Sequence, residues 1–215
     1  MTRDERAALL RGIYAIVNES TAVDPVALTR AILQSGVRIV QYRAKSGIVL
    51  AHARAMRDLT RASNALFIIN DDWRAARAYD ADGVHLGPED ALPEDLAAIR
   101  AVLPQAVIGI SCGTPEEARM ACAGDAADYI GVGSVYATGS KADAGDPIGV
   151  EGLRRVAQEA RLPVAAIGGI TLERLAQVRA SGVAMAAVIS AISGDPDPGR
   201  AAAQLVRAWR EGSLP

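Results

Sequence analysis

Short apolar runs recur along this sequence, and each is followed by a segment whose apolar residues have helical spacing. Residues 66–70, Leu-Phe-Ile-Ile-Asn, show the pattern, because consecutive apolar residues suit a strand buried on both faces of a parallel sheet. The expected strands are residues 12–17, 37–42, 66–70, 83–86, 107–110, 129–132, 164–167 and 185–189. The expected helices begin after Asp24 and cover 49–63, 73–79, 93–103, 115–123, 150–160, 171–180 and 199–210. This alternation predicts parallel strands joined by right-handed crossovers.

Eight strand–helix units in 215 residues favour a single (β/α)8 TIM barrel over a doubly wound open sheet. No linker divides the sequence, so residues 1–215 are expected to form one domain, with residues 1–10 as an N-terminal extension. Residues 133–149 form a long polar loop between an expected strand and helix. Loops of this length in small domains are usually functional, so we expect it to be an active-site loop.

Composition excludes several classes of function. The net charge is −2, so there is no overall basic field that would attract nucleic acid or anionic lipid. No apolar stretch approaches the ~20 residues of a membrane span, and the charged N-terminus lacks a signal-peptide core. The expected location is therefore the cytoplasm. Cys112 and Cys122 provide neither a disulfide framework nor zinc spacing, and we expect both to be packing residues.

Polar residues follow the second expected strand, where Gln41, Arg43 and Lys45 alternate. On an extended segment these side chains would share one face. Lys45 and Lys141 are the only lysines among 23 basic residues, and both lie in expected strand-end segments. Lysine is a compact charge that suits phosphate. The alternative is that both lysines lie on solvated loops.

Carboxylates follow the next two strands, Asp71 after residues 66–70 and Asp90 after residues 83–86. Carboxylates on neighbouring strand ends can hold a Mg²⁺ ion that completes its shell with water and substrate phosphate. Helix capping is the alternative, since Asp72 and Asp90 both precede expected helices.

Small and hydroxyl-bearing residues follow the last two strands, Gly168-Gly169 before Thr171, and Ile189-Ser190. Barrels often bind phosphate at these two loops, where backbone N–H groups face the anion. Turn glycines are the alternative. Within the 133–149 loop, Thr138, Ser140 and Lys141 could supply hydroxyls and a cation to a phosphate.

His85 alternates with Val84 and Leu86, so it is expected to face the barrel interior, where packing or hydrogen bonding is favoured over catalysis. His52 is expected on a helix surface, and Trp73 is expected to pack. Neither a Walker-type phosphate loop nor the dinucleotide-binding fingerprint is present.

Together these motifs resemble the thiamine phosphate synthase family from residue 14 to residue 198. The matching stretches are Gln-x-Arg-x-Lys at 41–45, Phe-Ile-Ile-Asn-Asp at 67–71, Ala-Asp-Gly-Val-His-Leu-Gly-x-Glu-Asp at 81–90, Ala-Asp-Tyr-Ile-Gly-x-Gly at 127–133, Ala-Ile-Gly-Gly-Ile-Thr at 166–171 and Ser-Ala-Ile at 190–192. The resemblance implies a barrel transferase that joins a hydroxymethylpyrimidine diphosphate to a thiazole phosphate and releases pyrophosphate. It also implies that the pyrimidine ionises to a carbocation, which the thiazole nitrogen captures.

The resemblance implies roles for individual residues. The pyrimidine diphosphate would be held by Gln41, Arg43, Lys45, Asn70, Ser111 and Lys141, of which Arg43, Lys45 and Lys141 would assist catalysis. The thiazole phosphate would be held by Thr138, Ser140, Gly169, Ile189 and Ser190, and Mg²⁺ would be bound by Asp71 and Asp90. The partners would be these small molecules, and a homodimer is an oligomeric state that the sequence leaves open.

The sequence departs from the family pattern at three places. The family's Pro-Thr-x-Thr-Lys is Ala-Thr-Gly-Ser-Lys at 137–141, Asn18 stands where aspartate is common, and Gly113 replaces a common histidine. In a related thiazole tautomerase group that histidine looks catalytic, so Gly113 argues against a tautomerase. A tautomerase-like isomerase and a non-catalytic phosphometabolite-binding barrel are the competing hypotheses.

Overall fold

The computed structural model describes residues 1–19, 23–87, 92–140 and 145–212. Its strands are β1 (Gly12–Asn18), β2 (Ile39–Arg43), β3 (Leu66–Asn70), β4 (Gly83–Leu86), β5 (Val107–Cys112), β6 (Tyr129–Val132), β7 (Val164–Ile167) and β8 (Met185–Val188). Its helices are α1 (Arg3–Ala7), α2 (Pro25–Gln34), α3 (Leu50–Ala62), α4 (Trp73–Ala78), α5 (Pro93–Val102), α6 (Pro115–Ala121), α7 (Gly149–Glu159), α8 (Leu175–Arg179), α9 (Ser190–Ser193) and α10 (Pro198–Glu211).

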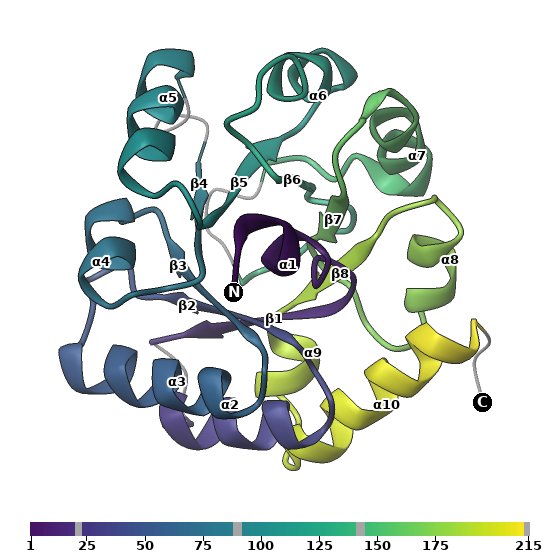
Figure 1. The fold of residues 1–215 in the computed structure, drawn as a ribbon. Coiled ribbons are helices and arrows are strands. Elements are labelled where there is room, and N and C mark those ends of the chain that lie inside the picture. The colour runs from purple at the N-terminus through teal and green to yellow at the C-terminus, as the bar shows by residue number, and fades with distance from the viewer. Residues whose placement is uncertain (20–22, 88–91, 141–144, 213–215) are drawn as a thin grey trace.

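The strands close into a barrel in sequence order, as the alternating pattern predicts. Every neighbouring pair is parallel, and β1 closes the ring by pairing with β8, with Gly12 opposite Met185. Helices surround the ring of strands (Figure 1). The (β/α)8 barrel prediction is therefore confirmed, and all strand carboxyl ends lie at the same end of the barrel.

Local sequence signals explain where several helices begin. The Asp24 carboxylate accepts a hydrogen bond from the Ala27 amide, and Pro25 occupies the first turn of α2. Thr114 and Glu117 form a reciprocal capping box at the start of α6, which also has a proline in its first turn. Both N-termini agree with the signals in the sequence.

The predicted helix over residues 171–180 is wrong in its first half, because α8 covers only Leu175–Arg179. Residues 171–174 form turns instead, with the Arg174 amide bonded to the Thr171 carbonyl. The Arg174 guanidinium folds back to donate to the Gly169 carbonyl at 2.7 Å. The loop that begins at Gly168-Gly169 therefore extends to Arg174, further than the spacing of apolar residues suggested. The short helices α1 and α9 were not predicted.

Two apolar layers stabilise the barrel. One set of strand residues faces the interior, including Tyr14, Ile68 and Met185. The alternate set, which includes Tyr42 and Phe67, packs against the surrounding helices. Successive strand residues point to opposite faces, so most strands contribute to both layers, whereas β4 contributes His85 to the interior in place of an apolar side chain.

A buried ionic cluster centred on Asp82 ties α1 to the amino-terminal end of the barrel. Asp82 directly precedes β4 and is fully buried. Its carboxylate accepts from Arg6 Nε at 3.0 Å, Arg57 Nη1 at 2.7 Å and the Phe67 amide at 3.0 Å. The charge is thus paired and hydrogen-bonded, as a buried carboxylate requires.

A second cluster repeats this design two strands further along. Asp128 directly precedes β6 and accepts from Arg3 Nε at 2.6 Å, Arg100 Nη2 at 2.6 Å and the Ile108 amide at 2.7 Å. Helix α1 therefore contributes one arginine to each cluster, and it lies across the centre of the ring in Figure 1. The N-terminal extension closes the amino-terminal end of the barrel.

Among the described residues, no helix combines the length and the apolar character that a membrane-crossing segment needs.

We predict that Asp82→Asn lowers the free energy of unfolding by about 3–5 kcal/mol, because it leaves the Arg6 and Arg57 charges without their buried counter-ion. Urea denaturation would measure the change. Glu151→Gln, which removes an exposed pair with Arg154, is the control and should change stability by less than about 0.5 kcal/mol. Equal effects of the two substitutions would contradict the role given to the Asp82 cluster.

Candidate active site

A cavity of about 380 Å³ opens at the carboxyl ends of the strands. Its floor includes Tyr14, Gln41 and Ala165 from within the barrel, and its rim includes residues of the loops after β5 to β8. Each of the eight strands contributes at least one lining residue. Such a volume is at the lower end of the range for small-molecule sites.

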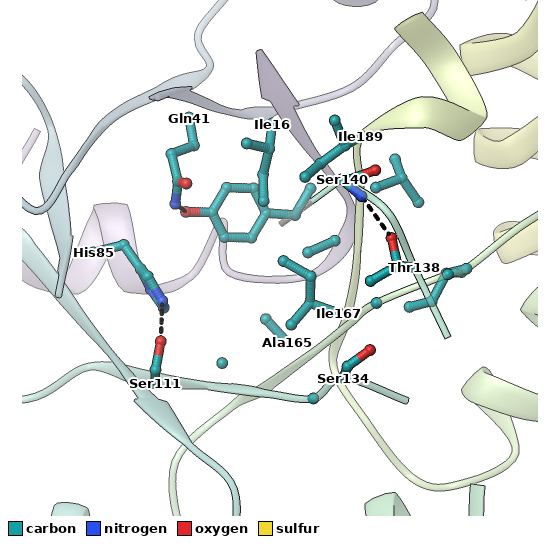
Figure 2. A pocket seen from close by; sticks show the side chains of 18 of the residues that line it. Ile16, Gln41, His85, Ser111, Ser134, Thr138, Ser140, Ala165, Ile167 and Ile189 are labelled. Carbon is teal, nitrogen blue, oxygen red and sulfur yellow. Dashed lines mark hydrogen bonds between the residues drawn. The ribbon is translucent and has the colours of Figure 1, made fainter. Parts of the chain in front are cut away.

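Most of the residues predicted for the site line this cavity. They come from the ends of five strands and from the 133–149 loop, so the barrel brings together segments far apart in the sequence (Figure 2). These residues are Gln41, Arg43, Asn70, Ser111, Thr138, Ser140, Gly169, Ile189 and Ser190.

Lys45 does not line the cavity, contrary to the expected shared face with Gln41 and Arg43. Strand β2 ends at Arg43, and a turn follows in which the Gly47 amide donates to the Ala44 carbonyl. The alternation that places Gln41 and Arg43 on the interior face therefore stops before Lys45, which is exposed.

The paired aspartates after β3 have separate environments. Asp72 caps α4, accepting from the Ala75 amide at 2.8 Å, which confirms its capping role. Asp71 is exposed at the strand end, where its amide donates to the His85 carbonyl at 2.8 Å and its carboxylate accepts from Asn70 Nδ2. The residue that caps α4 is therefore Asp72 and not Asp71.

Two predicted site residues, Asp90 and Lys141, lie outside the described residues. Helix α5 has Leu92 as its N-cap residue. No group of three or more metal-ligating His, Cys, Asp or Glu side chains occurs within the described ranges. Asp71 beside Asn70 still suits Mg²⁺, because this ion usually takes one or two carboxylates and completes its shell with water and phosphate.

A line of hydrogen bonds, which we call the interior network, crosses the barrel beneath the cavity. Gln41 Nε2 donates to Tyr14 Oη at 2.7 Å, and Tyr14 Oη lies 2.9 Å from Tyr129 Oη. Tyr129 Oη lies 3.1 Å from His85 Nδ1, and His85 Nε2 lies 3.2 Å from Ser111 Oγ. The predicted interior position of His85 is confirmed. Figure 2 shows Gln41 on one side of the cavity and the His85–Ser111 pair on another.

Two glycine residues leave room for the rings of this network. A Cβ atom at Gly109 would lie 2.1 Å from Tyr129 Cζ, and one at Gly131 would lie 2.8 Å from His85 Cε1. Any larger residue at these positions would displace a ring of the network. Burial raises the pKa of both the Tyr14 and Tyr129 hydroxyls above the ordinary tyrosine value, so both remain protonated donors.

Sequence reasoning missed the two tyrosines of the network. Tyr14 lines the cavity and Tyr129 is fully buried beneath it. Both belong to the apolar layer that faces the barrel interior, and the sequence analysis assigned no role to either. Nothing in the periodicity indicated that their hydroxyls would meet, because that depends on the register between strands that are not neighbours.

The rim after β6 and β7 is held together by backbone bonds. The Val135 amide donates to the Ile167 carbonyl at 2.8 Å, and the Tyr136 amide donates to the Gly168 carbonyl at 3.0 Å. Gly169 has a φ of +60°, and a Cβ atom there would lie 2.7 Å from the Ala137 carbonyl oxygen. Glycine is therefore required at this loop, both for its conformation and for the close approach of the neighbouring backbone.

The fold and this cavity define the protein as a (β/α)8-barrel enzyme with its site at the strand carboxyl ends. The family model described as thiamine monophosphate synthase matches residues 13–192. The sequence is 45% identical over 182 residues to the thiamine-phosphate synthase of Moorella thermoacetica, covering 83% of this chain and 85% of that protein. The chain belongs to the thiamine monophosphate synthase family.

Two further relatives agree. A bifunctional thiamine biosynthesis protein, ThiM/ThiE, of Symbiobacterium thermophilum is 49% identical over 195 residues, which cover 88% of this chain and 39% of that longer protein. The solved structure of a thiamine phosphate pyrophosphorylase from Pyrococcus furiosus superposes with a TM-score of 0.85 at 35% identity, covering 94% of this chain and 97% of that one.

Cys112 is the one cysteine of the described residues that lines the cavity, and we predict that its thiol is unreactive at neutral pH. Burial, with a smaller contribution from the Glu117 carboxylate, raises the pKa of Cys112 to about 12. The thiolate fraction at pH 8 should then be about one in ten thousand. In a Cys122→Ser background, alkylation should be slow in the folded protein and should accelerate as the pH rises. Rapid alkylation of Cys112 at pH 8 in the folded protein would contradict the raised pKa of its thiol.

Proposed function

We propose that this transferase condenses 4-amino-2-methyl-5-hydroxymethylpyrimidine diphosphate with 4-methyl-5-(2-hydroxyethyl)thiazole phosphate, giving thiamine phosphate and pyrophosphate. The observation that carries the proposal is that the family's motif residues, from strand ends far apart in the sequence, line one cavity. A small-molecule reaction of this kind fits the cavity volume, and the cytoplasm is the proposed location.

The pyrimidine diphosphate would lie along the β2, β3 and β5 side. Gln41 and Ser111 offer hydrogen-bonding groups at the depth of the interior network, where a flat heterocycle could lie. Arg43 and Asn70 occupy the last residues of their strands and line the same cavity. The diphosphate would extend past these residues toward Asp71, with Lys141 and Lys45 supplying further positive charge from the adjoining loops.

Asp71, with Asn70 beside it, would hold Mg²⁺, and Asp90 is proposed as the second carboxylate. Bound there, the ion would supply positive charge to the diphosphate as it leaves. Arg43 would orient the same group by donating from a planar guanidinium. Asp71 and Arg43 would therefore determine the direction in which the diphosphate leaves.

The thiazole phosphate would occupy the opposite side of the rim. Gly168 and Gly169 bring the backbone close to the cavity, and Ile189 and Ser190 line it from the other loop. Thr138 and Ser140 add hydroxyl groups from the 133–149 loop, where the Ser140 amide donates to Thr138 Oγ1 at 3.2 Å. Both ends of this loop are fixed, because the Ile148 amide donates to the Ser134 carbonyl. Residues beyond its fixed base could cover the site during turnover.

The reaction needs little covalent chemistry from the protein. Breaking the bond to the diphosphate leaves a pyrimidine carbocation, and the thiazole nitrogen supplies the electron pair that forms the new bond. The enzyme must hold both substrates in line and exclude water, which would otherwise capture the cation. A tautomerase would need a general base, and both ring nitrogens of His85 already have hydrogen-bond partners within the barrel.

A coupling assay tests the proposed function. Purified protein would be incubated with both phosphorylated substrates, with and without Mg²⁺, while pyrophosphate release is followed. We expect release to require both substrates and a divalent cation. Binding of the substrates without turnover would instead support a non-catalytic barrel.

Asp71→Asn should lower kcat by about 100-fold or more, because the amide cannot replace a carboxylate that offsets the charge of Mg²⁺. Asparagine tolerates the φ of +62° at this position, so the backbone should be preserved. Asp72→Asn is the matched control, since asparagine also caps helices well. Its activity and Mg²⁺ dependence should match those of the wild type. Similar losses in both variants would contradict the assignment of Asp71.

Ser190→Glu should raise the KM for the thiazole phosphate at least about tenfold, because a carboxylate would repel the phosphate. Ser190→Gln has nearly the same size without the charge and should have a much smaller effect. Steady-state kinetics with each substrate varied would separate the two sites. Equal effects of the glutamate and glutamine substitutions, or an unchanged KM in both variants, would contradict the proposal that the β8 loop binds the thiazole phosphate.

A further inference from the structure

The interior network joins two residues that the proposed function assigns to the pyrimidine. Gln41 lies at one end and Ser111 at the other, while Tyr14, Tyr129 and His85 connect them through the barrel. The connecting residues come from β1, β6 and β4, so the network spans strands that are not neighbours.

The positions of the hydrogen atoms follow from the first donor. Gln41 Nε2 can only donate, so Tyr14 Oη accepts and directs its own hydrogen to Tyr129 Oη. The Tyr129 hydrogen then goes to His85 Nδ1, which must be an unprotonated acceptor. In a neutral imidazole the hydrogen is then on Nε2, from which it is donated to Ser111 Oγ. This arrangement satisfies every member of the network.

The two ends therefore offer opposite groups to the cavity. With its amide nitrogen turned to Tyr14, Gln41 presents its amide oxygen as an acceptor. Ser111 Oγ accepts from His85, so its own hydrogen is left to donate toward the cavity that it lines. A heterocycle with an exocyclic amino group beside a ring nitrogen carries the complementary donor and acceptor.

We propose that Tyr14, Tyr129 and His85 are positioning residues that fix the hydrogen-bond direction of Gln41 and Ser111. They determine which edge of the aminopyrimidine can lie on the cavity floor. This inference rests on the proposed function for the identity of the ligand, but the hydrogen positions do not depend on it. Buried networks of this kind are rigid because any reversal leaves a buried group unpaired unless every bond reverses together.

The experiment has one spectroscopic and one kinetic measurement. Nitrogen-15 NMR of the wild type, with His85 assigned by His85→Gln, should show the hydrogen on Nε2 and an acceptor at Nδ1. Tyr129→Phe removes the central hydroxyl while keeping the ring, so the preference for this tautomer should weaken. A hydrogen on Nδ1 in the wild type would mean that the network runs in the opposite direction, which would overturn the proposal.

In kinetics, Tyr129→Phe should lower kcat/KM for the pyrimidine diphosphate by about five- to tenfold, the size expected for one hydrogen bond, while the KM for the thiazole phosphate stays unchanged. Tyr42→Phe is the matched control, because Tyr42 is also buried but its hydroxyl donates to Glu19 outside this network. Tyr42→Phe should leave both parameters unchanged. Equal losses for both substrates in Tyr129→Phe, or none, would overturn the proposal.

The two measurements separate this inference from the proposed function. If the wild type releases no pyrophosphate, the function fails, whereas the tautomer of His85 still tests the direction of the network. If coupling proceeds but Tyr129→Phe changes neither the tautomer nor the pyrimidine kinetics, the function stands and the positioning role fails.

Discussion

Closure of the sheet with all strands parallel is the constraint on which the rest of the structure depends. Because β1 pairs with β8 in the same direction as every other pair, all eight carboxyl ends share one opening. The amino-terminal end of the barrel, as far as the structure describes it, holds no part of this site. There α1 covers the barrel and stabilises it through the Asp82 and Asp128 clusters. Stabilising charges and binding groups thus lie at opposite ends, so substitutions in one set need not affect the other.

The interior network lies between these two ends, where a small barrel would ordinarily be filled with apolar side chains. Placing hydroxyl, amide and imidazole groups there is favourable only if each finds a partner. Gly109 and Gly131 give the rings of Tyr129 and His85 the space to do so. The cavity floor therefore carries hydrogen-bonding groups that the network holds in place, which suits a reaction that depends on positioning two substrates.

The sequence predicted the barrel well because strand periodicity and helix capping are local signals. It also predicted that Gln41 and Arg43 share one face, because alternation along a strand fixes which residues point the same way, and both line the cavity. Two predictions failed because tertiary contacts determine the local conformation. Lys45 does not share the inward face of Gln41 and Arg43, because a turn begins after Arg43. Residues 171–174 are not helical, because they lie beside the glycine loop, to which Arg174 donates a hydrogen bond.

The most direct test of the central claim, that the strand ends share one site, is a crystal structure with thiamine phosphate, pyrophosphate and Mn²⁺. We expect pyrophosphate beside Arg43 and Asn70, anomalous scattering from Mn²⁺ at Asp71, and the phosphate of thiamine phosphate between Gly169 and Ser190. Ligands bound at the amino-terminal end or on the outer helices, with the cavity empty, would contradict the account.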